Sequence, residues 1–377
     1  MRIDILDPGL YTKAGHHLEW NLRLARELTA RGHKVHVHSH MNLDVEAAKL
    51  LSHCALVTPR FRILPYWESA PSLRGANGSR PLSDPVSGQL VHFLDGAQLL
   101  AEDLHSLEDA DLRIWPSLAA HQLYASSLSA SRIPNVSCIH VESSIQLSAG
   151  PMFWRYAWLA SKKAGLDFRF GVTVPELQEH FSSLVPEQKF SILPICLDGR
   201  TPSKPRPCIR RIGFFGHQRG EKGIGLLNEL VSRLLPEGWE VVVQDSGGLI
   251  HGNGSNNLIS LGYVKDIAEE INKCDLIVVP YQESAYRYRG SSVVWEALAC
   301  GVPVIVPRKT APSNFAMTLQ AGKEFFALAV SDVHSAIKSA EVDYKFLADK
   351  AYLASKNWAN THGVSRFTDA ILDSADT

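Results

Sequence analysis

The sequence predicts an α/β protein made of two Rossmann-like domains, and three observations support this prediction. The chain has 377 residues, which is more than one hydrophobic core usually holds. Short apolar runs rich in β-branched residues alternate with segments of helical periodicity, as in parallel sheets covered by helices. Residues 196–207 (CLDGRTPSKPRP) have the composition of a linker. We therefore expect an N-terminal domain over residues 1–197 and a second domain that begins at residue 198.

The composition is typical of a cytoplasmic globular protein. The formal net charge of −1 provides no basic footprint, so nucleic acid is not an expected partner. Six cysteines occur without a CxxC pair, which favours buried reduced thiols over a disulfide framework or a zinc site. The N-terminus lacks the basic region and long apolar segment of a signal peptide, and no apolar run reaches the length of a membrane span.

The chain begins with a Rossmann-like β–loop–α–β unit. Residues 3–6 form a short apolar strand, and a loop leads to Gly15, His16 and His17. Leucines at helical spacing follow, before a second strand begins near residue 34. The loop lacks GxGxxG, so a nicotinamide cofactor has little support. Each histidine is either a ligand or base in a site, or a residue that caps or packs the helix start.

A second polar group follows the strand predicted over residues 136–141. His140 stands at the C-terminal end of this strand and Glu142 comes just after it. Ligands of open α/β sheets bind beyond this end of the strands. The alternative interpretation is a structural histidine. The other apolar segments predict strands over residues 112–115, 168–174 and 189–193, and helices over 91–107, 119–129 and 175–184.

Two segments of the first half allow alternative interpretations. Residues 65–88 are dense in proline, glycine, serine and asparagine and predict a long loop, which is either an acceptor-side lid or simply mobile. Residues 152–169 combine large aromatic side chains with arginine and lysine. They form either a helix that contacts a membrane surface or a core-facing aromatic helix with a basic outer face. The first alternative would make the protein peripheral at the inner face of the membrane.

The second half contains two segments typical of anion binding. A strand predicted over residues 211–215 is followed by Gly216 and by a basic, glycine-rich turn that extends to residue 223. Such a turn before a helix is typical of phosphate-binding loops. A strand over residues 276–279 precedes a polar loop with two arginines and Gly290. Ser291 and Ser292 then offer N-caps for a helix whose unpaired N–H groups attract anions. An ordinary strand–loop–helix unit with a solvated loop is the alternative for this second segment.

These segments carry a family resemblance. GSSVVWEALACGVPVIV, over residues 290–306, resembles the donor-site signature of retaining GT-B glycosyltransferases of the family 4 type, a class that includes many bacterial polysaccharide enzymes. Glu296 matches the second signature glutamate, which binds the nucleotide ribose in that family. Tyr288 stands where the first glutamate is expected. The turn from residue 216 resembles the family's Gly-Arg-Leu-x-x-x-Lys-Gly motif: Lys222 matches the lysine, while His217 replaces the arginine and Arg219 follows two residues later.

The resemblance implies a complete architecture. The two domains would face each other across a cleft, with the donor bound by residues 198–350. Residues 351–377 would form a helix that packs back on the N-terminal domain. Tyr263 would lie in the segment that lines the base. His140 and the Gly15 loop would meet the transferred sugar.

The predicted activity is that of a hexosyltransferase-type glycosyltransferase acting with retention. It would move a sugar from a nucleotide diphosphate donor, a UDP- or GDP-sugar, to a hydroxyl of a glycan, lipid-linked or small-molecule acceptor. The resemblance implies no bound cofactor and no metal. A nucleotide-sugar epimerase and a non-catalytic sugar-nucleotide-binding subunit are the alternatives. The predicted catalytic residues are His140, Lys222 and Arg219; the predicted donor-binding residues are Gly15, Gly216, His217, Tyr263, Arg289, Gly290, Ser291, Ser292, Val293 and Glu296; His16, His17 and Glu142 are predicted on the acceptor side.

Overall fold

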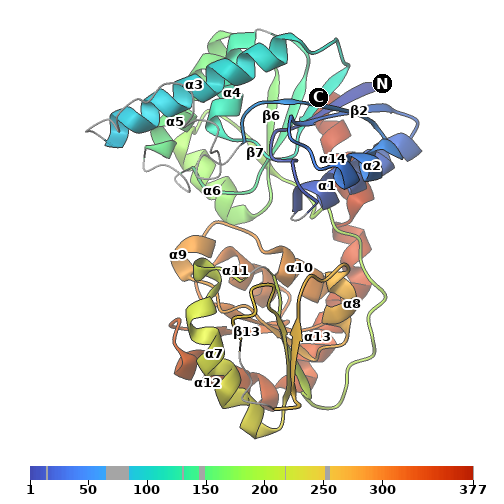
Figure 1. Cartoon of the computed structure of the whole chain (residues 1–377), viewed down its shortest axis with the longest axis vertical. Helices are drawn as coiled ribbons and strands as arrows, with labels where there is room; N and C mark the ends of the chain where they lie inside the picture. Colours follow the sequence, from blue (N-terminus) through green and yellow to red (C-terminus); the bar gives the residue numbers. More distant parts are fainter. Residues whose placement is uncertain are drawn as a thin grey trace. The chain divides into compact units, whose positions relative to one another are not determined.

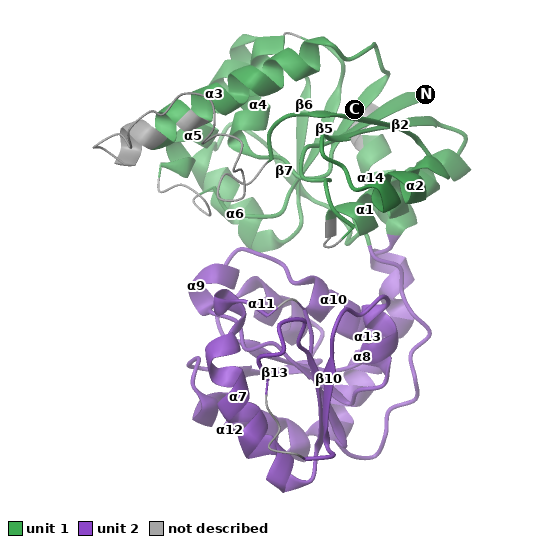
Figure 2. Cartoon of the chain, in the orientation of Figure 1, with its two compact units in different colours: residues 1–196, 364–377 green, residues 197–363 purple. Residues whose placement is uncertain are grey.

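The chain folds into two compact units, each built around its own parallel sheet (Figure 2). This computed structural model describes residues 1–13, 16–64, 85–129, 131–143, 149–216, 218–250 and 255–376. Unit 1 comprises residues 1–196 and 364–377, and unit 2 comprises residues 197–363. The α/β class and the two Rossmann-like domains predicted from the sequence are therefore confirmed.

Unit 1 contains a seven-stranded sheet in the order β3-β2-β1-β4-β5-β6-β7, with all neighbours parallel (Figure 1). The chain moves outward from β1 to β3 and then returns to the other side of β1, so a topological switch point lies between β1 and β4. The strands are β1 (Arg2–Asp7), β2 (Lys34–His40), β3 (Leu56–Phe61), β4 (Leu112–Trp115), β5 (Asn135–Ile139), β6 (Phe168–Val172) and β7 (Phe190–Ile192).

Helices cover both faces of this sheet, whose central strands β4, β5 and β6 are buried along almost their whole length. One face packs alternate residues of β1 and β2 against α1 and α14, in a core that includes Ile3, Ile5, Leu22 and Phe367. The predicted helix over 91–107 begins earlier, at Pro85, while 65–84 lie outside the described residues. The helices are α1 (His16–Ala30), α2 (Val45–Ser52), α3 (Pro85–His105), α4 (Ala120–Ser129), α5 (Gly150–Lys163), α6 (Pro175–Leu184) and α14 (Val364–Asp376).

Helix α5 buries one face and exposes the other. Phe153, Trp154 and Trp158 are buried, as expected of a core-facing aromatic helix. Tyr156 and Leu159 are about half exposed, so the outer face carries apolar as well as basic side chains. None of the helices within the described part of the chain is long and apolar enough to cross a bilayer.

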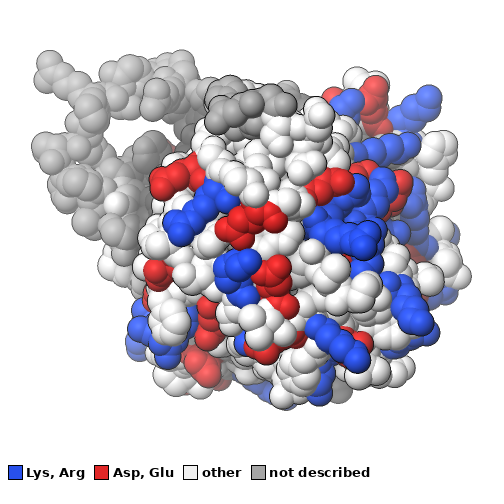
Figure 3. All heavy atoms as spheres, turned by 90° about the horizontal axis from the view of Figure 1, so that it is seen from below, with Lys and Arg blue, Asp and Glu red and all other residues white. Residues whose placement is uncertain are grey.

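Unit 2 contains a six-stranded parallel sheet in the order β10-β9-β8-β11-β12-β13. Its core packs α7 and α12 against the sheet, around Phe214, Leu230 and Ile337. Acidic side chains lie among the basic ones on the face shown in Figure 3. The strands are β8 (Arg211–Phe214), β9 (Glu240–Gln244), β10 (Leu258–Leu261), β11 (Leu276–Val278), β12 (Val304–Pro307) and β13 (Gly322–Phe325); the α-helices are α7 (Ile224–Leu234), α8 (Ile267–Asn272), α9 (Glu283–Tyr286), α10 (Ser292–Ala299), α11 (Ala311–Thr318), α12 (Val330–Val342) and α13 (Tyr344–Thr361).

The C-terminal segment divides between the units. Residues 351–361 belong to α13, which packs on α10 in unit 2 and donates a hydrogen bond from Trp358 Nε1 to the Leu197 carbonyl at 2.7 Å. Gly363, with φ of 111°, separates α13 from α14. Helix α14 packs on α1 in unit 1. Of the predicted segment 351–377, only the part after Gly363 therefore belongs to unit 1.

The cysteines differ in part from the expectation of buried thiols. All six are free, and four of them are buried. Cys208, in the segment that enters unit 2, is exposed and Cys54 is half-buried.

Candidate functional site

The two anion-binding segments of unit 2 meet at its topological switch point. The sheet order places β8 beside β11, although β9 and β10 lie between them in sequence. The turn over residues 215–223 leaves the C-terminal end of β8, and the loop over residues 279–291 leaves that of β11. Ligands of doubly wound sheets bind at such a point. The fold thus brings together two motifs that lie about 70 residues apart in the sequence.

Direct contacts fix these two loops to each other. The backbone N–H of Gln282 donates to the Glu221 carbonyl at 2.9 Å, and its side-chain amide donates to the Gly220 carbonyl at 3.2 Å. Gly223 has φ of 77°, and a Cβ atom there would lie 2.1 Å from the Pro280 carbonyl oxygen. Only glycine therefore allows the close approach of the loops. The sequence indicated Gly223 as part of the motif, but the contact with Pro280 has no local sequence signal.

Lys222 lies where the two motifs converge. A Cβ atom at Gly216 would lie 3.0 Å from Lys222 Nζ and 3.3 Å from a methyl group of Val293. The ammonium group also lies 5.7 Å from the centre of the Tyr281 ring. Burial, with a contribution from Arg219, lowers the pKa of Lys222 to about 8. A poorly solvated amine beside a helix start is suited to bind an anion, which would favour its charged form.

The start of α10 supplies backbone donors to the same place. Ser291 is the N-cap, and its hydroxyl accepts a hydrogen bond from Val294 N at 3.3 Å and lies 3.3 Å from the Tyr281 hydroxyl. The N–H groups of Ser292 and Val293 belong to the first turn, where an α-helix leaves its donors unpaired. A Cβ atom at Gly290 would lie 2.1 Å from the Trp295 ring, so this ring packs directly on the glycine backbone.

The other predicted donor residues occupy different environments. Glu296, in the second turn of α10, is only 6% exposed. Arg289 lies over the Tyr286 ring, with 5.9 Å between its guanidinium carbon and the ring centre. Arg219 is 61% exposed and pairs with Glu221 at 3.7 Å. Tyr263 follows β10 and is largely exposed, and His217 lies outside the described residues.

Sequence reasoning missed an aromatic pair beneath this site. Tyr281 and Tyr286 stack with their ring centres 4.0 Å apart and their planes inclined by 24°. Burial raises the pKa of both phenols, to about 12 for Tyr286, so both stay neutral. The one local signal was the position of Tyr281, three residues after the end of β11. The pair supports Ser291 on one side and Arg289 on the other.

A pocket of about 440 Å³ opens beside these residues, at the C-terminal ends of β11, β12 and β13. Glu283 and Arg287 line it from the loop after β11, and Arg308 and Phe326 line it from the other two strands. The Arg308 guanidinium carbon lies 5.0 Å from the centre of the Phe326 ring. Neither Arg308 nor Phe326 was predicted as a site residue.

Unit 1 holds a buried Asp–His pair at its own switch point. Asp7 ends β1, and its carboxylate lies 2.9 Å from His17 Nδ1 in α1. Asn21 Nδ2 and Gly9 N donate to the same carboxylate at 2.6 Å and 2.9 Å. Burial alone would raise the pKa of Asp7, but His17 and these donors lower it. Burial alone would lower the pKa of His17, but the carboxylate of Asp7 outweighs this effect and raises it. The pair is therefore stabilised as carboxylate and imidazolium.

His140 lies near this pair. Its Nε2 is 2.5 Å from the Pro116 carbonyl, which can only accept, so Nε2 carries the proton and Nδ1 does not. The ring makes an edge contact with Trp20, with 4.2 Å between the ring centres. Burial lowers the pKa of His140 to about 4, and the charge of His17 adds to this effect. His140 is consequently neutral at pH 7.

The remaining predicted residues of unit 1 are less informative. Glu142 is buried close to His180, whose pKa burial lowers and Glu142 raises. His180 Nε2 in turn lies 2.8 Å from the Ser143 hydroxyl. Gly15 lies outside the described residues, and only the backbone of His16 is described, as the first residue of α1.

Comparisons with known proteins agree with this geometry. Residues 209–340 match the family model described as "Glycosyl transferases group 1". The whole chain is similar in fold to sucrose-phosphate synthase from Thermosynechococcus elongatus, with 12% identity, 99% and 98% of the two chains covered and a TM-score of 0.72. It is also similar to Anabaena HepE in complex with UDP, with 16% identity, full coverage of both chains and a TM-score of 0.69.

A third similar structure is a glycosyltransferase from Rickettsia africae, with 14% identity, 100% and 98% coverage and a TM-score of 0.69. No curated protein matches the chain. The fold is thus that of the GT-B class, and the prediction of a transferase is supported by the family model.

Proposed function

Because residues 209–340 match the glycosyl transferases group 1 model and the chain has the GT-B fold, we propose that this protein transfers a sugar from a nucleotide diphosphate to a hydroxyl acceptor. One observation carries the proposal. Gly216 lies beside both Lys222 Nζ and a methyl group of Val293, so a cation, a glycine turn and a helix start share one place. These three elements together suit a diphosphate.

In this proposal the diphosphate is the leaving group and unit 2 stabilises its growing negative charge. Lys222 and the N–H groups of Ser292 and Val293 bind the phosphate oxygens, with Arg219 adding charge from the more exposed side. These groups would neutralise the charge without a metal ion. Glu296 binds the ribose hydroxyls and Tyr263 lines the base. A UDP-sugar is the first donor to test, because HepE was solved with UDP, and a GDP-sugar is the second.

The transferred sugar requires a contact other than the missing first glutamate. The pocket beside Tyr281 supports a place for it, since Glu283, Arg287 and Arg308 offer hydrogen-bonding groups there. From unit 1, we propose that neutral His140 meets the sugar, together with the loop at Gly15. We propose retention of configuration, and the resemblance of the segment around Glu296 to the family signature supports it. The same resemblance supports a family 4 type of enzyme acting in glycan or polysaccharide synthesis.

The acceptor side is assigned to unit 1. The Asp7–His17 pair lies at the switch point of that unit, and His16 and Glu142 belong to neighbouring loops and helices. The exposed Tyr156 and Leu159 of α5, with Lys162 and Lys163 at its end, favour a lipid-linked acceptor reached by peripheral contact with the inner face of the membrane.

The decisive experiment is a binding and turnover assay with a matched control. Thermal unfolding is followed with UDP, GDP, ADP, dTDP and their sugars. A nucleotide at about 100 times its Kd should stabilise the protein by about 2.7 kcal/mol. We expect Lys222→Ala to lose this response and at least about 100-fold in turnover, while Lys345→Ala, at an exposed site of unit 2, retains both.

Each other outcome has a defined meaning. Wild-type turnover by Lys222→Ala would refute the phosphate assignment. Binding of a nucleotide sugar without any product, in the presence of glycan and lipid-linked acceptors, would favour the non-catalytic subunit, for which Tyr288 is the motivating residue. Release of nucleotide without an acceptor product, together with an altered sugar, would favour the epimerase.

A further inference from the structure

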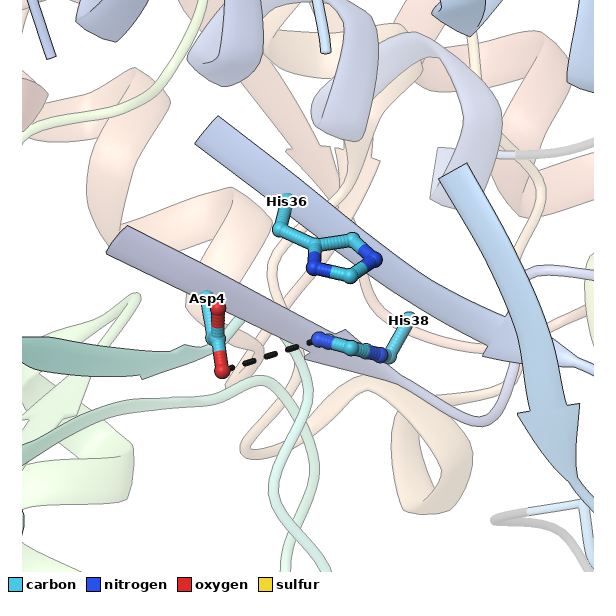
Figure 4. Close-up of side chains that lie close together, drawn as sticks. All are labelled: Asp4, His36 and His38. Atoms are coloured by element: carbon cyan, nitrogen blue, oxygen red, sulfur yellow. Dashed lines mark ion pairs between the residues drawn. The ribbon is translucent and has the colours of Figure 1, made fainter. Parts of the chain in front are cut away.

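Asp4, His36 and His38 form a cluster in unit 1 that the proposed transfer does not use (Figure 4). Asp4 lies on β1 and is directly opposite His36 on β2 in the sheet register. The side chains of Ile3, Ile5, Val35 and Val37 point into the core formed with α1. Because side chains alternate along a strand, the three cluster residues share the opposite face of the sheet.

The geometry of the cluster is that of a ligand set rather than a hydrogen-bonded group. The candidate ligand atoms of the three residues all lie within 4.8 Å of one another. His38 Nε2 is 3.6 Å from Asp4 Oδ2, which is too long for a hydrogen bond. Two ligands at about 2.1 Å from one tetrahedral ion are about 3.4 Å apart, so this separation suits a shared ion.

A second observation is that these groups are buried without hydrogen bonds. Asp4 is fully buried and His38 is 1% exposed. Within the described residues, no hydrogen-bond partner reaches either oxygen of Asp4 or either ring nitrogen of His38. A buried carboxylate without such partners is costly, and a bound cation would compensate it.

The nearby arginines do not supply that compensation directly. Arg2 Nε lies 3.8 Å from Asp4 Oδ1, and the guanidinium group of Arg2 forms its short contact, 2.8 Å, with Glu108. Arg113 faces Asp4 from β4 and also interacts with Asp109. Arg60, on β3, donates to the Ser106 carbonyl at 3.1 Å. Each arginine therefore has another partner, and none is within hydrogen-bond distance of Asp4.

We propose that Asp4, His36 and His38 bind a divalent first-row transition ion of the zinc type. Two imidazoles and one carboxylate are ligands that such ions prefer. His36 Nε2 is held 2.8 Å from the Thr58 hydroxyl, which fixes the ring in the manner of second-shell contacts.

The position of the site indicates a structural role. Asp4 lies three residues before Asp7, about 10 Å along β1 from the proposed acceptor side. An ion here would connect β1 to β2 and would not contact the substrate. Because His36 is half-buried, it offers the ion a route from solvent.

Cobalt provides a direct test that does not depend on glycosyl transfer. The full-length protein is stripped with a chelator and titrated with Co²⁺, while visible d–d absorption reports coordination by the protein. We expect one bound ion per chain, displacement by Zn²⁺, and a higher Tm with Zn²⁺. His36→Gln and His38→Gln should each weaken binding at least about tenfold, whereas His53→Gln, at an exposed site of the same unit, should bind as the wild type does.

Because His36 is only half-buried, His36→Gln should still fold. A circular dichroism spectrum equal to that of His53→Gln would show that its loss of metal binding is not caused by misfolding. The absence of d–d bands in the wild-type protein would overturn the proposal and would leave Asp4 compensated by arginines. Bands that persist unchanged in His36→Gln and His38→Gln would overturn it as well, because the ion would then be bound elsewhere.

Discussion

Lys222 is the residue on which the proposed donor site depends, because burial disfavours the charged form of its amine. Burial lowers the pKa of its amine to about 8, although a solvated lysine titrates far above neutrality. The amine lies beside the Gly216 backbone and 5.7 Å from the centre of the Tyr281 ring. A diphosphate would restore the favourable environment of the charged form, so ligand binding and protonation of Lys222 are coupled.

This coupling predicts a pH dependence of nucleotide binding. Below pH 8 the free protein already carries the charge, so the Kd for UDP should be nearly constant. Above pH 8 a proton must be taken up on binding, and the Kd should rise by up to about tenfold per pH unit. Titration calorimetry at several pH values checks this. Lys222→Arg keeps its charge throughout and should show a flat profile. Equal slopes in both proteins would contradict the assignment.

Gly223 supports a second prediction at the scale of one residue. In Gly223→Ala, the new Cβ atom would overlap the Pro280 carbonyl at a φ of 77°, so the two donor loops would separate. We expect a loss of about 1–3 kcal/mol in unfolding free energy, together with loss of nucleotide binding. The matched control is Gly225→Ala in α7, where a Cβ atom meets open space. If both variants bind UDP equally well, the close contact of the loops does not shape the site.

At the scale of elements, the sequence specified the strand–loop–helix units of the donor site well. Ser291, Gly290 and the apolar run of α10 are local signals, and the helix begins within one residue of the expected position. The stack of Tyr281 on Tyr286 and the contact of Gly223 with Pro280 depend instead on which strand lies beside which. That neighbour relation is set by the whole sheet, so no local pattern predicts it. The Asp4–His36–His38 cluster was missed for the same reason.

Helix α5 yields a prediction at this scale. Its outer face exposes Tyr156 and Leu159 beside basic residues, a combination that suits an anionic bilayer surface. Wild-type protein should sediment with phosphatidylglycerol vesicles and not with phosphatidylcholine vesicles. Tyr156→Glu combined with Leu159→Glu should weaken this binding by at least about tenfold, because two apolar anchors are lost. Leu353→Glu changes an equally exposed leucine of unit 2 and is the control. Unchanged sedimentation of the double variant would refute membrane contact through α5.

At the scale of the whole molecule, periodicity and length were sufficient to predict two Rossmann-like domains, since alternating strands and helices allow few architectures. The end of the chain was harder to predict. The sequence predicted one helix over residues 351–377, and only Gly363, at a φ of 111°, marks where α13 ends before α14 begins. The two helices look alike in sequence because each has an apolar stripe along one side. Which part of the protein each stripe packs against is decided by the tertiary fold.

That division has a consequence for the newly made chain. Unit 1 needs Phe367 and Ile371, which are buried in its core, yet 167 residues (197–363) separate them from the rest of the unit. On the ribosome, at about 5–20 residues per second, the first 196 residues would wait roughly 10–30 s for this last helix to be synthesised. Unit 2 is continuous in sequence and has no such wait. During translation, unit 2 therefore has all of its residues before unit 1 does, although unit 1 contains the N-terminus of the chain.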